Sequence, residues 1–310
     1  MPDCDQSESE PGGSVASVSV VIPHFGDPAP TQELVRQLLA QQDSPIVEII
    51  VSDDHSPTPF PPAPGIRVIH RETNGGFGAN VNSGAAAATG EYLLILNSDL
   101  EIGPRFVADL VEAAAPWQPC VAGSAMVDPA GHPAPTARHF PTTGHQVTEW
   151  LTPLARFRDR RPLHEAVGHD TRAVRGATLP VDWLVGAVLL IPTRVFRDVG
   201  GFDERFFMNS EEVDLQRRLR GVGIPSIYCG TVSVTHESGG SSDPGRRRTW
   251  LVDSRLTYAN KWGGRRRLQL GLTAASVANL GWNTTRRLRG VDVAPVATLR
   301  SELDLIWGRR

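Results

Sequence analysis

Lysine and cysteine are almost missing from this chain of 310 residues. Lys261 is the only lysine among 31 basic residues, so arginine carries nearly all of the positive charge. The three cysteines, Cys4, Cys120 and Cys229, are odd in number and widely spaced, and they lack the spacing of a metal site. We therefore expect reduced thiols and a cytoplasmic protein.

Long apolar runs and targeting signals are also lacking. The longest apolar run, Trp183 to Pro192, is about half as long as a membrane-spanning helix needs to be. Residues 1–16 are acidic and rich in Ser, Pro and Gly, without the basic start and apolar centre of a signal peptide. We therefore expect a disordered N-terminal tail and no transmembrane helix.

Positive charge is concentrated near the end of the chain. Residues 246–310 carry 14 basic and 4 acidic side chains, a balance of +10 within a chain of net charge −3. Aromatic residues do not interleave with the arginines as stacking platforms would, and no nucleic-acid motif accompanies them, so we expect no nucleic-acid partner. Leu268, Leu270 and Leu272 lie among the apolar residues between Arg clusters. This pattern indicates either basic helices on the inner face of an anionic membrane or a solvated basic face.

Strand and helix patterns alternate over most of the chain. The expected strands are 15–23, 47–51, 66–70, 92–96, 121–127, 183–191, 226–229 and 232–236. The expected helices are 31–42, 76–88, 104–115 and one that starts near Ser210. This alternation predicts an α/β domain with a doubly wound, mainly parallel, Rossmann-like sheet that binds ligands outside the carboxyl ends of its strands.

Three regions follow from this pattern. Residues 17–245 form the expected catalytic domain, and residues 246–310 form a basic helical extension. Residues 128–180, rich in Pro, His and Arg without a clear period, are interpreted as a variable insertion.

The segment from residue 200 to 218 is the most informative, because three carboxylates fall within four residues. Glu211, Glu212 and Asp214 repel one another, and their burial is costly unless a proton or a cation offsets it. Such a cluster indicates a cleft in which one acid acts as a general base. The alternative is a helix N-terminus whose acids favour the helix dipole, followed by Arg217 and Arg218.

Two further segments are suited to holding a nucleotide. Asp53 directly follows an apolar strand, where it could accept hydrogen bonds from a base or a ribose; an Asx-turn or cap with Ser56 is the alternative. The glycines in residues 74–84 would let the backbone approach a phosphate at the start of the next helix. The alternative is that these glycines serve only a turn and a tightly packed helix.

A divalent cation would suit the carboxyl end of the strand at 92–96. Asn97 and Asp99 offer oxygen atoms, which Mg²⁺ and Mn²⁺ prefer, and phosphates and waters can complete the coordination. His236 ends its own strand before a Ser/Gly loop, where it could add an imidazole ligand or touch the phosphate. A lone histidine is more often structural.

Taken in order, these segments resemble glycosyltransferase family 2, the inverting GT-A enzymes, and especially its bacterial rhamnosyltransferase-like members. The resemblance covers about residues 17–262, and the matching segments are 20–23, 51–56, 74–84, 96–99, 200–207 and 211–215. It implies that Asp53 contacts the nucleotide, that Asp99 binds the metal and that Glu212 is the catalytic base. Glu212 stands where aspartate is usual, so Glu211 remains a rival for that role.

The resemblance also implies wider sets of site residues. Asn97 replaces the first acid of the family's Asp-x-Asp motif, a change that keeps an oxygen but removes a charge. The candidate contacts of the nucleotide sugar are Pro23, Asp53, Asn74, Gly76, Asn80, Asn97, Asp214 and Arg218. The candidate metal ligands are Asp99 and His236.

The function implied is an inverting transfer of rhamnose or a similar sugar from a nucleoside-diphosphate sugar, with Mg²⁺ or Mn²⁺. The acceptor would be a saccharide or a polyprenyl-diphosphate-linked sugar in cell-envelope polysaccharide synthesis, which the cluster of Arg255, Tyr258, Lys261 and Trp262 could contact. One alternative is a relative that binds nucleotide sugars without catalysis. The other is a nucleotidyltransferase, which would want a Gly-rich, basic loop after the first strand that residues 23–27 lack.

Overall fold

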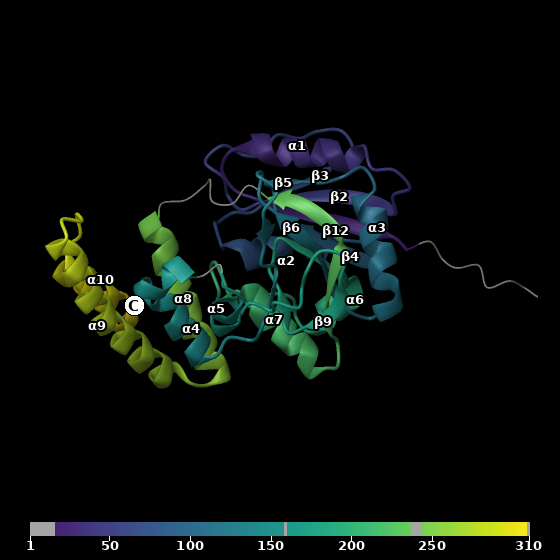
Figure 1. The fold of residues 1–310 in the computed structure, drawn as a ribbon. Helices are drawn as coiled ribbons and strands as arrows, with labels where there is room; N and C mark the ends of the chain where they lie inside the picture. Colours follow the sequence, from purple (N-terminus) through teal and green to yellow (C-terminus); the bar gives the residue numbers. More distant parts are fainter. Residues whose placement is uncertain (1–15, 158–159, 237–243, 309–310) are drawn as a thin grey trace, which may run out of the picture.

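The structure is a computed structural model that describes residues 16–157, 160–236 and 244–308 (Figure 1). The expected N-terminal tail lies outside these residues except for its last one. The Ser/Gly loop that follows His236 also lies outside them.

One mixed sheet forms the centre of the molecule, in the order β3-β2-β1-β4-β11-β6-β12-β5. The strands are β1 (Val18–His24), β2 (Ile46–Asp53), β3 (Arg67–His70), β4 (Tyr92–Leu96), β5 (Leu100–Glu101), β6 (Val121–Val127), β11 (Val188–Pro192) and β12 (Ser226–His236). Strands β1 to β4 are parallel to one another, and β6 is parallel to β12. Strand β11 runs antiparallel between β4 and β6. The predicted α/β class with a mainly parallel sheet is confirmed.

Helices cover both faces of this sheet, which explains why its central strands are apolar along their whole length. On one face, α1 (Pro28–Leu39) packs on β1 and α3 (Phe106–Ala114) packs on β12 and β6, in one core that includes Val20 and Ile22 of β1. On the other face, α2 (Phe77–Ala87), α6 (Thr193–Asp198) and α7 (Glu211–Gly221) lie over the side of β1 that carries Val21. Successive side chains of β1 point to opposite faces of the sheet, so this strand contributes to two separate hydrophobic cores.

Several expected boundaries shift for local reasons. Helix α1 starts before the expected residue 31, because the Asp27 side chain accepts a hydrogen bond from the Ala29 N–H and Pro28 suits a first helical turn. The two strands expected at 226–229 and 232–236 form a single strand, β12, with an irregular register between Cys229 and Ser233. The strand expected at 183–191 is divided by a turn into β10 (Trp183–Leu184) and β11.

Residues 128–180 contain regular structure despite their aperiodic sequence. They form β7 (Pro133–Ala134), β8 (Ala137–Arg138), α4 (Thr143–Trp150), the 3₁₀ helix η2 (Thr152–Phe157), α5 (Arg161–Ala166) and, continuing to residue 181, β9 (Thr178–Val181). Strand β9 pairs with β12, and β8 pairs with β10. The segment therefore builds part of the sheet edge and a wall beside α7, which its sequence did not predict.

Three helices form an arm beside the sheet (Figure 1): α8 (Pro244–Trp262), α9 (Arg265–Leu288) and α10 (Pro295–Trp307). The arm joins the rest of the chain through α4, because Trp150 Nε1 donates to Ser276 Oγ at 2.9 Å. It also joins through α8, where Ser254 Oγ donates to the Met208 carbonyl at 2.6 Å. Helix α8 thus belongs structurally to the region around α7.

The two cysteines that the structure describes are free and buried, as the sequence led us to expect. Burial raises the pKa of Cys120 to about 12 and that of Cys229 to about 11. Both thiols therefore stay protonated and unreactive near neutral pH.

The segment that leads into α7 packs against the start of α2, and this contact requires a glycine. The Phe77 N–H donates to the Phe207 carbonyl at 3.0 Å. A Cβ atom at Gly76 would lie 1.8 Å from that same carbonyl oxygen. Gly76 also has φ +84°, in the left-handed region that favours glycine.

We predict that Gly76→Ala lowers the melting temperature much more than Gly131→Ala. Both glycines have nearly the same positive φ, which costs a non-glycine residue about 1–2 kcal/mol, but nothing lies within 4 Å of a Cβ at Gly131. The difference between the two variants, measured by thermal denaturation, reports the close approach of Phe207 together with the extended ψ of −178° at Gly76. Equal losses would show that the approach is not tight in solution.

Candidate active site

The carboxyl ends of three neighbouring parallel strands bring most of the expected nucleotide-binding residues to one edge of the sheet. Pro23 lies near the end of β1, Asp53 ends β2, and Asn97 directly follows β4. The register pairs Pro23 with Ser52 and His24 with Asp53, so these ends are level. Ligands of open α/β sheets bind at this edge, which we call the donor edge.

Asp53 shapes the loop that follows it. Its carboxylate accepts hydrogen bonds from the backbone N–H groups of Ser56 (3.0 Å) and Phe60 (2.9 Å), and it lies 3.2 Å from His70 Nδ1. Burial by itself would raise the pKa of Asp53, but these hydrogen bonds outweigh it and lower the pKa. The geometry matches the cap that the sequence offered as an alternative, and a contact of Asp53 with a nucleotide stays a prediction.

Asp54, which we did not single out from the sequence, holds the glycine loop. Its carboxylate accepts hydrogen bonds from the N–H groups of Gly75 (3.0 Å) and Gly76 (2.8 Å). Arg71 Nε lies 2.8 Å from the same carboxylate, which offsets its charge. The loop that opens α2 therefore keeps one conformation without any ligand.

Two asparagines at the donor edge have buried carbonyl oxygens without hydrogen-bond partners among the described residues. Asn80 donates through Nδ2 to the His24 carbonyl at 3.3 Å, and its Oδ1 has no partner. Asn97 Oδ1 is likewise buried and unpaired. Asn74, by contrast, accepts from the Gly76 N–H at 3.3 Å. Since unpaired buried polar atoms are uncommon, those of Asn80 and Asn97 indicate a place for an external partner.

The two expected metal ligands meet in space. Asp99 Oδ1 lies 3.1 Å from His236 Nε2, although the residues are 137 positions apart. The pair forms because His236 ends β12 and is registered with Leu100 of β5, the residue that follows Asp99. With the unpaired oxygen of Asn97, the group offers the oxygen and imidazole atoms that Mg²⁺ or Mn²⁺ accepts, so the residues fit such an ion.

The paired acids stand in the first turn of α7, where the helix dipole favours negative charge. Glu212 lines a cavity of about 330 Å³, and its Oε2 is buried without a hydrogen-bond partner. Glu211 is buried instead against α2, close to Gly78, and its Oε2 is also unpaired. The two neighbours therefore face different surroundings, and only Glu212 faces the cavity.

Burial raises the pKa of both acids. For Glu211 the charge of Glu212 adds to burial, and the pKa is well above its ordinary value. For Glu212 burial is the largest effect, but backbone hydrogen bonds and the positive charge of Arg138 act against it. Glu212, unlike Glu211, thus lies near a positive charge that favours its ionised form, which a general base needs.

Asp214 and Arg218 are engaged by contacts within the protein, and a contact of either with the nucleotide stays a prediction. Asp214 is 0% exposed, and its carboxylate accepts hydrogen bonds from Arg218 Nε (2.9 Å), Lys261 Nζ (2.8 Å) and Trp262 Nε1 (2.9 Å). Arg218 also donates to the carbonyls of Val199 and Gly201, both at 2.6 Å. Lys261 and Trp262 thus fasten α8 to α7 through Asp214, and a contact of either with the acceptor stays a prediction.

The cavity beside Glu212 is built from segments that are far apart in the sequence. Its lining residues are Arg138, His139, Pro141, His145, Gln146, Glu149, Val167, Gly168, Trp183, Val185, Asn209, Ser210, Glu212, Val213, Leu251, Arg255 and Tyr258. None of the expected donor-edge residues is among them. Sequence reasoning missed Arg138 and Glu149, because they lie in the aperiodic segment 128–180, whose surplus of His and Arg was the only sign.

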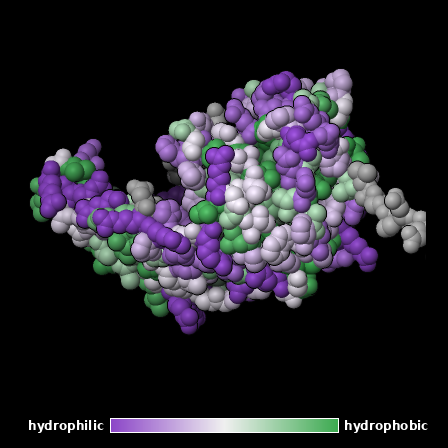
Figure 2. Space-filling model, turned by 45° about the vertical axis from the view of Figure 1, so that its right-hand side comes forward, coloured by the Kyte–Doolittle hydropathy of each residue, from purple (hydrophilic) through white to green (hydrophobic). Residues whose placement is uncertain are grey.

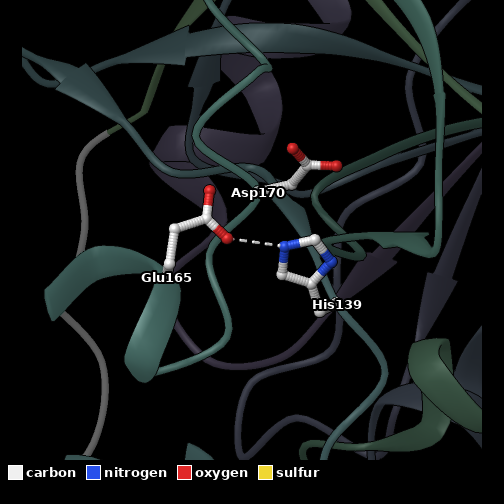
Figure 3. Close-up of side chains that lie close together, drawn as sticks. All are labelled: His139, Glu165 and Asp170. Carbon is white, nitrogen blue, oxygen red and sulfur yellow. Dashed lines mark hydrogen bonds and ion pairs between the residues drawn. The ribbon is translucent and has the colours of Figure 1, made fainter. Parts of the chain in front are cut away.

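His139, Glu165 and Asp170 form a second cluster with the composition of a metal site, next to the cavity. Figure 3 shows His139 turned toward Glu165, with its Nε2 atom 2.8 Å from the carboxylate. The oxygens of Glu165 and Asp170 are already engaged, however, by the N–H of Thr171 (2.9 Å) and the guanidinium of Arg172 (2.6 and 2.9 Å). The cluster therefore orients His139 at the cavity wall, and we assign no metal to it.

The sheet, its donor edge and the acids of α7 define the class of protein, a glycosyltransferase with a GT-A-like fold. Residues 19–175 match the family model "Glycosyl transferase family 2", and the chain belongs to that family. A solved structure, "Crystal structure of GalNAc-T7 with UDP, GalNAc and Mn2+", is similar in fold, with a TM-score of 0.52 and 14% sequence identity. The alignment covers 78% of this chain and 48%, about half, of that chain.

Sequence relatives place the chain among the rhamnosyltransferase-like members. It is 31% identical over 213 residues to N-acetylglucosaminyl-diphospho-decaprenol L-rhamnosyltransferase of Mycobacterium tuberculosis, covering 63% of this chain and 68% of the relative. It is 28% identical over 253 residues to validoxylamine A glucosyltransferase of Streptomyces hygroscopicus subsp. limoneus, covering 75% of this chain and 53% of the relative. The resemblance inferred from the sequence motifs is confirmed.

We predict that Glu212→Gln lowers turnover about 100-fold or more, because the amide keeps the size of the side chain but cannot accept a proton. Donor binding should survive. Glu211→Gln should keep most of the activity, because burial and the charge of Glu212 already favour the protonated form of Glu211. Loss of activity in Glu211→Gln, together with an active Glu212→Gln, would contradict the assignment.

The pH profile of the wild type tests the same assignment. Since the folded protein raises the pKa of Glu212 above 4.5, the base is protonated at low pH and turnover should rise with pH through a midpoint above 4.5. Turnover would be measured against pH with saturating substrates. A midpoint at or below 4.5 would contradict a buried base.

Proposed function

We propose that this glycosyltransferase moves rhamnose or a similar sugar from a nucleoside-diphosphate sugar to an acceptor hydroxyl, with inversion at the anomeric carbon. One observation carries the proposal: the Glu212 side chain, at the start of α7, lines a cavity that contains none of the expected donor-edge residues. The donor and the acceptor can therefore reach the base from different sides. An inverting transfer needs that arrangement, since the acceptor attacks opposite the leaving group.

In this mechanism the Glu212 carboxylate takes the proton of the acceptor hydroxyl as the hydroxyl oxygen attacks the anomeric carbon. The bond to the diphosphate breaks in the same step, and no covalent intermediate forms on the protein. Pro23, Asn80 and the backbone of Asn74 and Gly76 orient the donor at the edge of the sheet.

Asn97, Asp99 and His236 would hold the divalent cation beside the diphosphate. The bound Mg²⁺ or Mn²⁺ would neutralise charge on the leaving group. The contact between Asp99 and His236 joins the turn after β4 to the end of β12, so the proposed position of the diphosphate would depend on this contact.

We infer that the acceptor is a saccharide, carried on a polyprenyl diphosphate, in cell-envelope polysaccharide synthesis. The name of the mycobacterial relative, which describes a lipid-linked acceptor, supports this inference. The test is to incubate the protein with a panel of nucleoside-diphosphate sugars, including one of rhamnose, and to measure nucleoside diphosphate release with and without an N-acetylglucosaminyl-diphospho-lipid. Release that requires the acceptor supports transfer, whereas donor binding without release would favour the alternative of a non-catalytic relative.

We predict that Asp99→Ala abolishes transfer and Mn²⁺-dependent nucleotide binding, because the remaining Asn97 and His236 supply no negative charge. Glu101→Ala is the matched control, since this acid lies two residues further on and is exposed. The measurements are product formation and nucleotide binding with and without Mn²⁺. Full activity in excess EDTA would contradict the metal-assisted mechanism.

We further propose that α9 lies on an anionic membrane surface. No helix in the described part of the chain is long and apolar enough to cross a membrane. The outer face of α9, however, exposes Leu270 (63%) and Val277 (55%) between clusters of arginine at 265–267 and 286–289, and Leu288 (83%) within the second cluster. Arginine beside exposed apolar side chains is typical of helices that lie at the surface of a bilayer.

The spatial arrangement also corrects which leucines can contact a membrane. Leu268 and Leu272, which the sequence placed with Leu270 between the Arg clusters, are buried in the core of the arm with Leu256 and Ile306. Figure 2 shows hydrophilic side chains gathered along the upper edge of the arm and less polar ones below them. Truncation before α9 would therefore disrupt the core of the arm, so point variants are needed.

We predict strong binding to anionic liposomes at low salt that falls steeply as salt rises. Each basic residue near such a surface contributes about 1 kcal/mol, and salt screens the attraction. Replacing all of Arg265, Arg266 and Arg267 by Gln, or Leu270 by Glu, should weaken the binding, whereas Arg194→Gln on α6 should not. Cosedimentation with vesicles measures this binding. If the wild type does not bind anionic vesicles at low salt, the proposal is refuted.

A further inference from the structure

Arg138 stands out among the residues of the cavity. It ends β8, which pairs with β10, and its guanidinium lies 5.6 Å from the centroid of the Trp183 ring of that strand. Its Nε atom is buried and has no hydrogen-bond partner, and among the described residues no ion pair to Arg138 is formed within 4.0 Å. Burial lowers the pKa of Arg138, whereas the more distant charges of Glu149 and Glu212 act against this shift.

The other arginines around the cavity are engaged. Arg255, which also lines it, forms an ion pair with Glu149. Arg217 donates to the hydroxyl of Tyr258 at 2.8 Å and stacks on Trp262, with 4.4 Å to the ring centroid. Their hydrogen bonds leave Arg138 as the guanidinium best placed to bind a ligand in the cavity.

We propose that Arg138 binds an anionic group of the acceptor, a phosphate or diphosphate ester, and thereby selects acceptors that carry one. This inference rests on the proposed function, because it takes Glu212 as the base that receives the proton of the acceptor. Glu212 and Arg138 line the same cavity, so one acceptor can present its hydroxyl to the first and its anion to the second.

The chemistry and size of the cavity agree with this ligand. The planar guanidinium donates two parallel hydrogen bonds to phosphate oxygens, a geometry that a lysine cannot provide. The volume of about 330 Å³ lies at the lower end of the range for small-molecule sites, which is enough for a sugar with part of its phosphate ester. No expected donor-edge residue lines the cavity, so the anion bound there is not the diphosphate of the donor.

A purely structural role for Arg138 makes a different prediction. The positive charge of Arg138 favours the ionised form of Glu212, so the arginine could act only through the base. In that case its loss would affect every acceptor equally. A direct contact with the acceptor would affect only the acceptors that carry an anion.

The experiment compares three acceptors that share one sugar: a neutral alkyl glycoside, the sugar 1-phosphate and a short-chain lipid diphosphate. Each is assayed with wild type, Arg138→Gln, Arg138→Lys and the control Arg194→Gln. We expect Arg138→Gln to raise KM for the acceptors that carry the anion at least tenfold more than KM for the neutral glycoside, which reports only the effect on Glu212. The KM of Arg138→Lys for the anionic acceptors should lie between the values of wild type and Arg138→Gln. The KM of Arg194→Gln should match that of wild type. Equal effects on neutral and anionic acceptors would overturn the proposal.

The two anionic acceptors distinguish the source of the phosphate. If Arg138→Gln raises KM for the sugar 1-phosphate as well as for the lipid diphosphate, Arg138 contacts the phosphate next to the sugar. If Arg138→Gln raises KM for the lipid diphosphate alone, Arg138 contacts the second phosphate, that of the lipid carrier. If Arg138→Gln does not fold, as judged by its melting temperature, the comparison is made with Arg138→Lys, and an unchanged ratio of KM values then overturns the proposal.

A binding measurement separates this inference from the proposed function. Inorganic pyrophosphate is titrated by calorimetry without divalent cation, and its affinity should fall at least tenfold in Arg138→Gln but not in Glu212→Gln. If the wild type transfers no sugar yet binds pyrophosphate through Arg138, the proposed function fails and the anion site stands. If the wild type transfers sugar but Arg138→Gln binds pyrophosphate as tightly as the wild type does, only the proposed anion site is refuted.

Discussion

The buried carboxylate of Asp214 is the contact on which the site depends. It is inaccessible to solvent and accepts hydrogen bonds from Arg218 on its own helix and from Lys261 and Trp262 on α8. Removing one partner of such a buried group typically costs about 3–5 kcal/mol, because a charge is then left uncompensated. The contact holds α8 against α7 two residues beyond Glu212, and α8 in turn supplies Arg255 and Tyr258 to the cavity.

The site is therefore assembled from two halves with different origins. The donor edge is built by the carboxyl ends of β1, β2 and β4, where level strand ends and the loop held by Asp54 leave little freedom. The acceptor side is built by β8, α4 and α8, which pack around the start of α7. Glu212 lies between the halves, with its Cβ atom 3.4 Å from where a Cβ of Gly186 would be.

Much of the donor half could be predicted from local sequence. Apolar runs that end in Asp53 or in Asn97 mark strands buried on both faces, and the family resemblance then assigns their ends to a nucleotide sugar. Asp99 and His236 were expected to share a metal, and the structure brings them to 3.1 Å. For Asp214 and Arg218 the sequence could not separate ligand binding from helix packing, because an acid and an arginine four residues apart form the same pattern in both cases.

The sequence by itself determined the order of strands and helices, the family and the acids of α7, because each depends on short patterns of apolar, glycine and charged residues. Only the tertiary structure decided that Glu212 and not Glu211 faces the cavity, and that Leu268 is buried while Leu270 is exposed. It also decided that Arg138 is left without a close counter-ion. The physical reason is that burial and pairing depend on segments far apart in the chain, which no local pattern records.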